Sequence, residues 1–167
     1  GVAPRRRAPF DGGRRRSLPA DVRRPRCEDH RSGRLRRRSS LYAAAPVGPS
    51  QPEFRNAVVS LVTRRTPRAL LAALLDIERA HGRVRAERWG PRLLDLDILL
   101  WRERVVDEPG LHVPHPELHR RRFALEPLAE LDPGARHPVL QKTVAELLAD
   151  VRDQPVQRLD SPLWRPR

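Results

Sequence analysis

The stretch from Leu93 to Trp101, LLDLDILLW, sets two acidic residues in an apolar background and predicts the strand around which the fold is organised. Side chains on a strand alternate between faces, so Asp95 and Asp97 are expected on the same face, with Cα atoms about 7 Å apart. Two carboxylates at this spacing on a rigid element can hold magnesium between them. The alternative is a solvated polar strand face.

Helices are predicted on both sides of this strand. Thr66-Pro67 supplies an N-cap hydroxyl and a proline in the first turn, and an apolar stripe follows from Leu70 to Ile77. Gly82 is expected to end that helix. A final helix is predicted from Thr143 to Val151, with Thr143 and Glu146 in capping-box spacing.

Further strands are predicted by β-branched and apolar residues. Phe54 to Thr63 is expected to form one strand, Ser40-Leu41-Tyr42 to end another, and Val105-Val106 to pair beside the strand at 93–101. Phe123 to Leu131 is apolar without a clear period. Strands and helices are interspersed without a βαβ repeat, which predicts an α+β fold with helices packed on a sheet.

The segment before the acidic strand is rich in arginine. Its four guanidinium groups come from Arg83, Arg85, Arg88 and Arg92, while Trp89 and Gly90-Pro91 provide an aromatic lid and a turn. Arginines beside carboxylates are expected where magnesium and a polyphosphate lie between them. The alternative is that these arginines neutralise surface acids such as Glu87.

The net charge of +13 is unevenly distributed. Residues 1–38 hold 14 arginines and four acidic residues, a net charge of +10, and the remaining sequence is close to balanced. Residues 1–38 are therefore expected to be a disordered or frame-shifted Arg/Pro/Gly-rich segment, with the folded domain at 39–160. A basic arm that binds nucleic acid is the alternative.

Several classes of protein are not supported by the sequence. It has no phosphate-binding loop of the G-x-x-x-x-G-K-[ST] type, no G-x-G-x-x-G and no nucleophile elbow. Cys27 is the single cysteine, which excludes a disulfide framework, and no apolar run reaches the roughly 20 residues of a membrane span. A cytoplasmic, monomeric protein is expected.

Several motifs together resemble one family, 6-hydroxymethyl-7,8-dihydropterin pyrophosphokinase. The longest is Arg88-Trp89-Gly90-Pro91-Arg92-Leu93-Leu94-Asp95-Leu96-Asp97-Ile98-Leu99. The others, in chain order, are Gly48, Gln51 to Ala57, Ile77-Glu78, Gly82-Arg83, Val113-Pro114-His115-Pro116, Arg121-Arg122-Phe123 and Pro127-Leu128. They cover residues 39 to about 150.

The resemblance implies a ferredoxin-like α+β fold and pyrophosphate transfer from ATP to the hydroxymethyl-dihydropterin in folate biosynthesis. It implies that Asp95 and Asp97 bind two Mg²⁺ ions and that Arg83 and Arg92 contact the transferring phosphates. It implies that ATP is contacted by Glu78, Trp89, His115 and Arg121. It implies that the pterin is contacted by Val47, Phe54, Asn56 and Phe123, with the two phenylalanines stacking on the ring.

Residues 1–38 depart from this pattern. The family opens with an apolar strand, a glycine-serine-asparagine turn and an amphipathic helix, and these residues contain none of the three. The first strand is therefore expected to be missing or replaced, and an inactive fragment of the family is a further alternative. Ala44 also stands where the family often has threonine.

Overall fold

The computed structural model describes residues 33–44, 54–81 and 94–166. Its elements, in chain order, are β1 (Arg34–Arg38), β2 (Leu41–Ala44), β3 (Phe54–Asn56), β4 (Val59–Val62), α1 (Pro67–Ala80), β5 (Val106–Glu108), β6 (Leu111–Val113), the 3-10 helix η1 (Leu118–Arg120), α2 (Arg122–Leu131), α3 (Val144–Ala149) and β7 (Val156–Leu159). The α+β class predicted from the sequence is confirmed.

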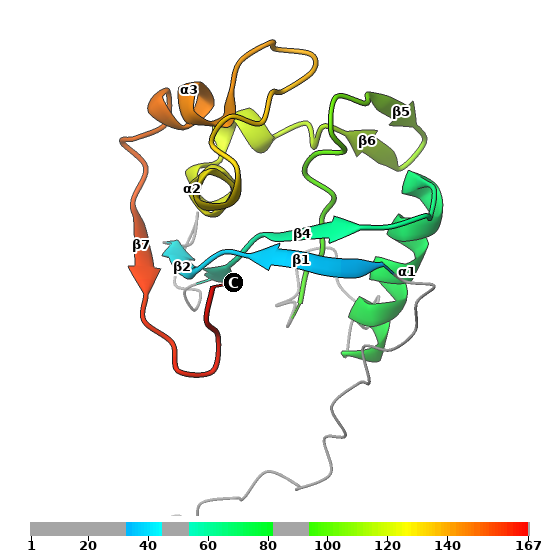
Figure 1. Cartoon of the computed structure of the whole chain (residues 1–167), viewed down its shortest axis with the longest axis horizontal. Helices are drawn as coiled ribbons and strands as arrows, with labels where there is room; N and C mark the ends of the chain where they lie inside the picture. The colour runs from blue at the N-terminus through cyan, green and yellow to red at the C-terminus, as the bar shows by residue number, and fades with distance from the viewer. Residues whose placement is uncertain (1–32, 45–53, 82–93, 167) are drawn as a thin grey trace, which may run out of the picture.

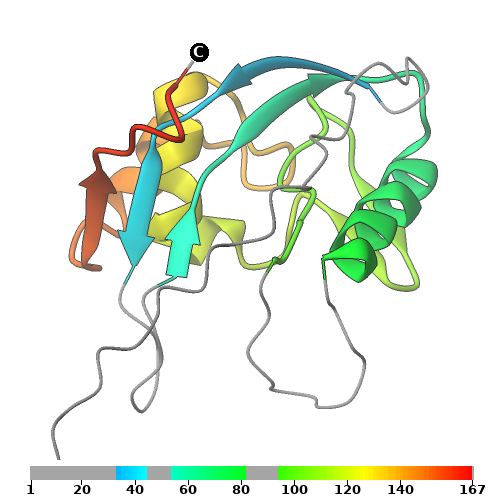
Figure 2. The ribbon, with the colours of Figure 1, turned by 90° about the horizontal axis from the view of Figure 1, so that it is seen from below.

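Within these residues the strands form three small antiparallel sheets. The strand orders are β1-β4, β3-β2-β7 and β5-β6. Helix α2 lies above the strands β2 and β4, with α3 beyond it, while α1 stands at the other end of the molecule (Figure 1). Viewed from below, the chain that follows residue 94 runs between α1 and α2 (Figure 2).

The predicted strand Phe54–Thr63 is divided into two strands that belong to different sheets. Ser39 causes the break, because its amide nitrogen donates to the carbonyl oxygen of Val58 at 2.9 Å and its hydroxyl accepts from the Val58 amide nitrogen at 3.0 Å. β3 therefore pairs with β2, whereas β4 pairs with β1. A run of β-forming residues gives no sign of this change of partner.

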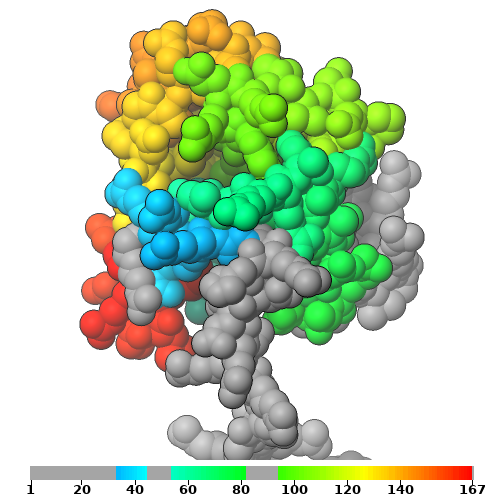
Figure 3. All heavy atoms as spheres, turned by 45° about the vertical axis from the view of Figure 1, so that its right-hand side comes forward, coloured from blue at the N-terminus to red at the C-terminus, as the bar shows by residue number. Residues whose placement is uncertain are grey.

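The expectation of no regular structure up to residue 38 does not hold for Arg34–Arg38. These residues form β1, which pairs along β4 with Arg34 opposite Val62 and Arg38 opposite Val59. An available strand edge imposes pairing that the arginine-rich composition does not predict. In the space-filling view, β1 and β4 lie side by side across the middle of the molecule (Figure 3). The remainder of the segment, up to residue 32, lies outside the described residues.

The prediction that residues 93–101 form a paired strand is wrong. Residues 94–100 belong to no assigned strand, and Trp101 makes only an isolated bridge to Glu103. Val106 pairs with Val113 instead, in the β5-β6 hairpin. The reason is that the backbone of 94–100 bonds to a side chain and to a loop, as described below, and no described strand lies along it.

The helices agree with their capping signals. The Thr66 hydroxyl accepts from the Ala69 amide nitrogen at 3.2 Å, and α1 ends at Ala80 with His81 as its C-cap, next to Gly82, which lies outside the described residues. Thr143 and Glu146 form the predicted capping box of α3. The apolar stretch of undetermined type at 123–131 is the helix α2.

The core is formed by η1, α2 and α3. Leu118, Leu125 and Val144 are completely buried, and Leu147 joins them at 2% exposed. Leu99 and Leu100 pack against this cluster, which attaches the acidic segment to the core. Burial of such side chains stabilises the fold by about 1.5 to 3 kcal/mol each.

One polar contact orients the β5-β6 hairpin relative to α1. The guanidinium group of Arg68, in the first turn of α1, donates to the Glu108 carboxylate at 2.7 Å and to the Pro109 carbonyl oxygen at 3.0 Å. Both side chains of the ion pair are half exposed, so the contact directs the hairpin more than it stabilises the fold. No helix among the described residues is long and apolar enough to span a bilayer.

Candidate functional site

The two aspartates of the acidic segment lie on its solvent side. Asp95 and Asp97 are exposed, whereas Leu94, Leu96 and Ile98 are partly buried. The alternation that the sequence predicted is therefore present, although the segment pairs with no strand among the described residues. Leu99 and Leu100 fix its far end to the core.

Two hydrogen bonds hold this segment in place. The amide nitrogen of Leu96, between the two aspartates, donates to Oε1 of Glu78 at 2.6 Å. The carbonyl oxygen of Leu99 accepts from the amide nitrogen of His115 at 2.9 Å. Both anchors involve residues that the sequence placed in the site, so α1, the acidic segment and the loop after β6 meet here.

His115 faces Asp97. Its Nε2 lies 3.9 Å from Asp97 Oδ2, and its side chain is largely buried, whereas that of Asp97 is 51% exposed. The Glu117 amide nitrogen donates to the Nδ1 of His115 at 3.1 Å, so Nδ1 is an acceptor. In the neutral ring the proton is therefore on Nε2, the nitrogen that faces the carboxylate.

Arg121 and Arg122 are adjacent but differ in their surroundings. The Arg122 guanidinium group donates to Glu126 at 2.8 Å and to the carbonyl oxygens of Arg152 and Gln154 at 2.7 and 2.8 Å. The guanidinium carbon of Arg121 lies 5.8 Å from the ring centroid of Phe123, a cation-π geometry. Arg122 thus joins α2 to the C-terminal segment, and Arg121 lies over an aromatic ring.

The residues assigned to the pterin lie on two neighbouring elements. Phe54 and Asn56 are on β3, two positions apart and so on the same face, and the side-chain Nδ2 of Asn56 donates to the Phe54 carbonyl oxygen at 3.3 Å. Phe54 is 49% exposed, whereas Phe123, in the first turn of α2, packs against the core. Helix α2 contacts β3, so the two rings belong to adjoining elements.

Glu78 is more deeply buried than a nucleotide ligand would be expected to be. It is 2% exposed, and its Oε1 accepts from the Leu96 amide nitrogen. Its assignment to ATP remains a prediction from the resemblance, and the observed bond gives it a second role. Arg83, Trp89, Arg92 and Val47 lie outside the described residues.

A cavity of about 290 Å³ adjoins the site, and the sequence did not indicate it. Its polar lining includes His112, His115, His119 and His137. His119 and His137 meet edge to face, with ring centroids 6.4 Å apart. Burial, and then the neighbouring His119, lower the pKa of His137. The four histidines come from β6, the loop after it, η1 and the segment after α2, so no local spacing in the sequence predicts the cavity.

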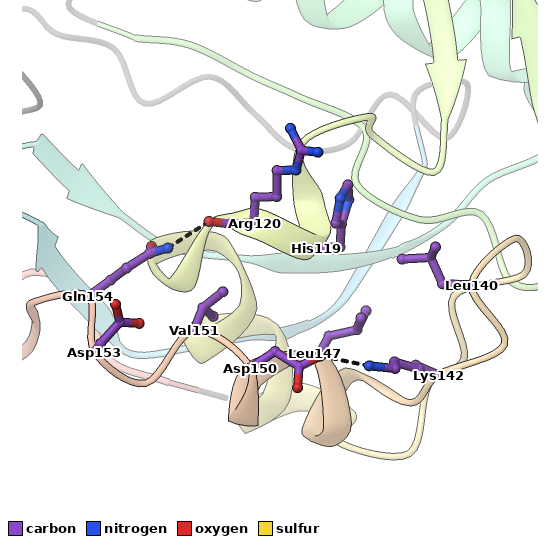
Figure 4. Close-up of a pocket in the computed structure, with 9 residues that line it drawn as sticks. All are labelled: His119, Arg120, Leu140, Lys142, Leu147, Asp150, Val151, Asp153 and Gln154. Carbon is purple, nitrogen blue, oxygen red and sulfur yellow. Dashed lines mark hydrogen bonds and ion pairs between the residues drawn. The ribbon is translucent and has the colours of Figure 1, made fainter.

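The larger cavity, of about 530 Å³, lies apart from the predicted residues. Figure 4 shows Lys142 pointing to Asp150 along its edge, at 2.8 Å, and the Gln154 side chain donating to the Arg120 carbonyl oxygen at 2.8 Å. None of the residues assigned to ATP, magnesium or the pterin lines it. The polar groups at this cavity bond to one another, and the residues implied for ATP, magnesium and the pterin lie elsewhere. The candidate site is therefore assigned to the acidic segment.

The donor set of the acidic segment fits magnesium. Among the described residues no three His, Cys, Asp or Glu side chains are grouped to enclose a metal ion. Asp95 and Asp97 instead offer two exposed carboxylates on one side. Magnesium in phosphoryl-transfer sites is held by one or two carboxylates and by substrate phosphates, so the pair meets that requirement.

Comparison with known proteins gives a consistent result. Residues 15–133 match the model of the family described as 7,8-dihydro-6-hydroxymethylpterin-pyrophosphokinase. A 2-amino-4-hydroxy-6-hydroxymethyldihydropteridine pyrophosphokinase from Pseudomonas aeruginosa is 48% identical over 122 residues, 72% of this chain and 75% of the relative. Proteins of the same name from Haemophilus influenzae and Synechocystis are 39% and 41% identical over 73% and 70% of this chain. The alignments cover 76% of the first and 60% of the second, less than two thirds of the Synechocystis protein.

Proposed function

Because the chain belongs to the 7,8-dihydro-6-hydroxymethylpterin-pyrophosphokinase family, we propose that it transfers pyrophosphate from ATP to 6-hydroxymethyl-7,8-dihydropterin. The products are AMP and the pterin diphosphate. The family and the names of its relatives indicate a diphosphokinase of folate biosynthesis that uses ATP as co-substrate. A cytoplasmic location and a monomeric state remain predictions.

The observation that carries the proposal is the arrangement of Asp95, Asp97 and His115. Two exposed carboxylates lie on a segment that is anchored at Leu96 and Leu99, and His115 Nε2 lies 3.9 Å from Asp97 Oδ2. A donor on His115 beside an acidic pair is an arrangement that can receive a phosphate chain together with its cations. This supports the proposed place of the ATP phosphates.

Asp95 and Asp97 are the residues that would hold two magnesium ions. When bound, magnesium neutralises charge on the phosphate oxygens and makes the β-phosphorus more electrophilic. The part of the protein is to keep both carboxylates on one side of an anchored segment, so that little reorganisation accompanies the reaction. This assignment is supported by the exposure of both aspartate side chains and by their common direction. Both follow from the alternation of partly buried and exposed side chains along 94–98.

The remaining residues bind and orient the substrates. His115 Nε2 and the Arg121 guanidinium group are proposed to donate to phosphate oxygens of ATP. Arg83, Arg92 and Trp89 are proposed to contact the transferring phosphates and to exclude water over them. Phe54 and Phe123 are proposed to stack on the pterin, with Val47 beside it and the Asn56 amide on its edge.

The reaction is a direct displacement. The hydroxymethyl oxygen of the pterin attacks the β-phosphorus, a new phosphorus–oxygen bond forms, and the bond from the β-phosphorus to the oxygen of the α-phosphate breaks. AMP leaves with that oxygen, and the hydroxyl proton is released to solvent. Positioning and charge stabilisation supply most of the catalysis in such transfers.

The test is an assay of AMP and pterin diphosphate, separated chromatographically, with ATP, magnesium and the pterin as reactants. We expect equal amounts of both products from the wild type, and loss of both with Asp97→Ala. ADP as the product, or no turnover in a sample with native circular dichroism, would contradict the proposal. Salt-sensitive binding to DNA or RNA in that same sample would favour the nucleic-acid alternative.

A further inference from the structure

The buried carboxylate of Glu78 stands in an unusual place. Glu78 and Leu70 are the two buried residues of α1, and the amphipathic pattern of the helix would lead one to expect an apolar side chain at such a position. Glu78 is 2% exposed, and within the part of the chain that the structure describes it is the one buried acidic residue. A charged group is retained in such surroundings when it makes a specific bond.

One hydrogen bond of Glu78 is to the segment that carries the aspartates. Its Oε1 accepts from the amide nitrogen of Leu96 at 2.6 Å, a short charge-assisted hydrogen bond. Leu96 is the one residue between Asp95 and Asp97. The N–H direction of an extended residue is roughly perpendicular to its side chain, so fixing this N–H fixes the rotation of the segment about its own axis.

Among the described residues, the bonds to the backbone of this segment come from a side chain and from a loop. In a sheet, neighbouring strands would hold the backbone of 94–100 and determine which side chains face solvent. Here the Leu96 amide bonds to Glu78 and the Leu99 carbonyl oxygen bonds to the His115 amide. One anchor lies before Asp97 and the other after it, so both together determine where its carboxylate points.

We infer that Glu78 is a positioning residue for the magnesium-binding pair: by holding the Leu96 amide it keeps Asp95 and Asp97 directed to the same side. The inference rests on the proposed function, since that function gives the pair its role. Glu78 acts through the backbone of Leu96 and has no contact with the reacting atoms in this role. What this role requires is an acceptor oxygen at this position.

The test compares Glu78→Gln with Glu78→Leu in the full-length chain. Glutamine keeps an acceptor oxygen in the same place, whereas leucine fills a similar volume without one. We expect Glu78→Gln, which keeps an acceptor for the Leu96 amide, to lose much less kcat than Glu78→Leu and to need less magnesium than Glu78→Leu for half-maximal activity. Misplaced catalytic groups typically cost about 100-fold, so Glu78→Leu should lose about that factor in kcat and need more magnesium, with the KM for the pterin little changed.

A second readout does not depend on turnover. Hydrogen exchange of the Leu96 amide, followed by NMR, should be slow in the wild type and in Glu78→Gln and fast in Glu78→Leu. Magnesium binding in the presence of α,β-methylene-ATP, measured by calorimetry, should weaken in Glu78→Leu alone. If the wild type has no turnover, the proposed function fails, and these two measurements still decide the role of Glu78.

The matched control is Glu130→Gln. The Glu130 carboxylate also accepts from a backbone amide, that of Ser40 at 2.9 Å, but it lies away from the acidic segment. We expect Glu130→Gln to leave Leu96 exchange and the magnesium dependence unchanged. The inference is overturned if Glu78→Leu keeps wild-type magnesium dependence, or if Glu78→Gln loses as much activity as Glu78→Leu while the Leu96 amide stays protected.

Discussion

His115 Nε2 lies 3.9 Å from Asp97 Oδ2, and this contact brings the loop after β6 to the acidic segment. In the neutral ring Nε2 carries the proton, because Nδ1 accepts from the Glu117 amide. Replacing His115 by Ala should therefore raise the KM for ATP more than it lowers kcat. Steady-state kinetics with ATP as the varied substrate measures this, and an unchanged KM for ATP would argue against a phosphate contact.

The carboxylate pair should be the most sensitive position in the chain. Asp95→Asn and Asp97→Asn keep the side-chain shape but remove the charge, and each is expected to lower kcat by about 100- to 1000-fold, as the loss of a single charge-stabilising group does elsewhere. Asp153→Asn, an exposed acid that lines the cavity of Figure 4, is the control and should behave as wild type. The assay is AMP release at saturating ATP.

The two phenylalanines should separate binding from stability. Phe54 is 49% exposed, so Phe54→Ala should leave the melting temperature almost unchanged and weaken pterin binding, by about 0.5 to 1.5 kcal/mol for the loss of one stacked ring. Phe123 packs against the core, so Phe123→Ala should lower both stability and affinity. Calorimetric titration with the pterin and thermal unfolding distinguish the two effects. Equal decreases in melting temperature for Phe54→Ala and Phe123→Ala would contradict the difference in packing between the two rings.

The Glu130 carboxylate should make stability depend on pH. Burial alone would raise its pKa, but hydrogen bonds from the Ser40 amide, the Tyr42 hydroxyl and the Ser40 hydroxyl outweigh burial, and the pKa of Glu130 is lowered from its ordinary 4.5. A lowered pKa in the folded state stabilises the protein above pH 4.5, and this contribution is lost as the pH falls through the folded value.

Urea unfolding of wild type and Glu130→Gln tests this. The wild type should be the more stable at neutral pH, and the difference in unfolding free energy should shrink as the pH falls below 4.5. Burial, and then the bond to Glu130, raise the pKa of Tyr42 to about 12. The contribution of the Tyr42 hydroxyl to the unfolding free energy is therefore complete below pH 10 and is lost as the pH rises through about 12. A difference in unfolding free energy between wild type and Glu130→Gln that does not vary with pH would contradict this role of the Glu130 carboxylate.

The capping box of α3 should contribute measurably to stability. The Thr143 hydroxyl accepts from the Glu146 amide nitrogen at 3.2 Å, and the Glu146 carboxylate accepts from the Thr143 amide nitrogen at 2.7 Å. Thr143→Ala should lower the unfolding free energy by about 1 kcal/mol, and Thr143→Ser should lower it far less. Denaturant unfolding of both variants measures this, with AMP release unchanged in each.

The sequence predicted the features that local chemistry determines. The N-termini of α1 and α3 follow from side-chain caps, at Thr66 and Thr143, and the solvent-facing direction of Asp95 and Asp97 follows from alternation. It could not predict strand partners, because these depend on distant residues. The Ser39 bonds to Val58 divide one expected strand into β3 and β4, and no local pattern announces them.

The site residues that the resemblance implies remain predictions. Among them, the structure places His115 Nε2 3.9 Å from Asp97 Oδ2 and Arg121 over the ring of Phe123. The contact between Glu78 and the Leu96 amide was not foreseen, because a buried acid within an amphipathic helix is indistinguishable, in sequence, from a residue at the helix edge. Roles for Arg83, Arg92, Trp89 and Val47 remain predictions.

A crystal structure of the chain with Mg²⁺ and α,β-methylene-ATP would test whether Asp95 and Asp97 hold the cations. We expect divalent-ion density within coordination distance of both Asp95 and Asp97, with the triphosphate on the side of His115. Nucleotide bound elsewhere, or nucleotide present with no cation between the two carboxylates, would contradict this expectation.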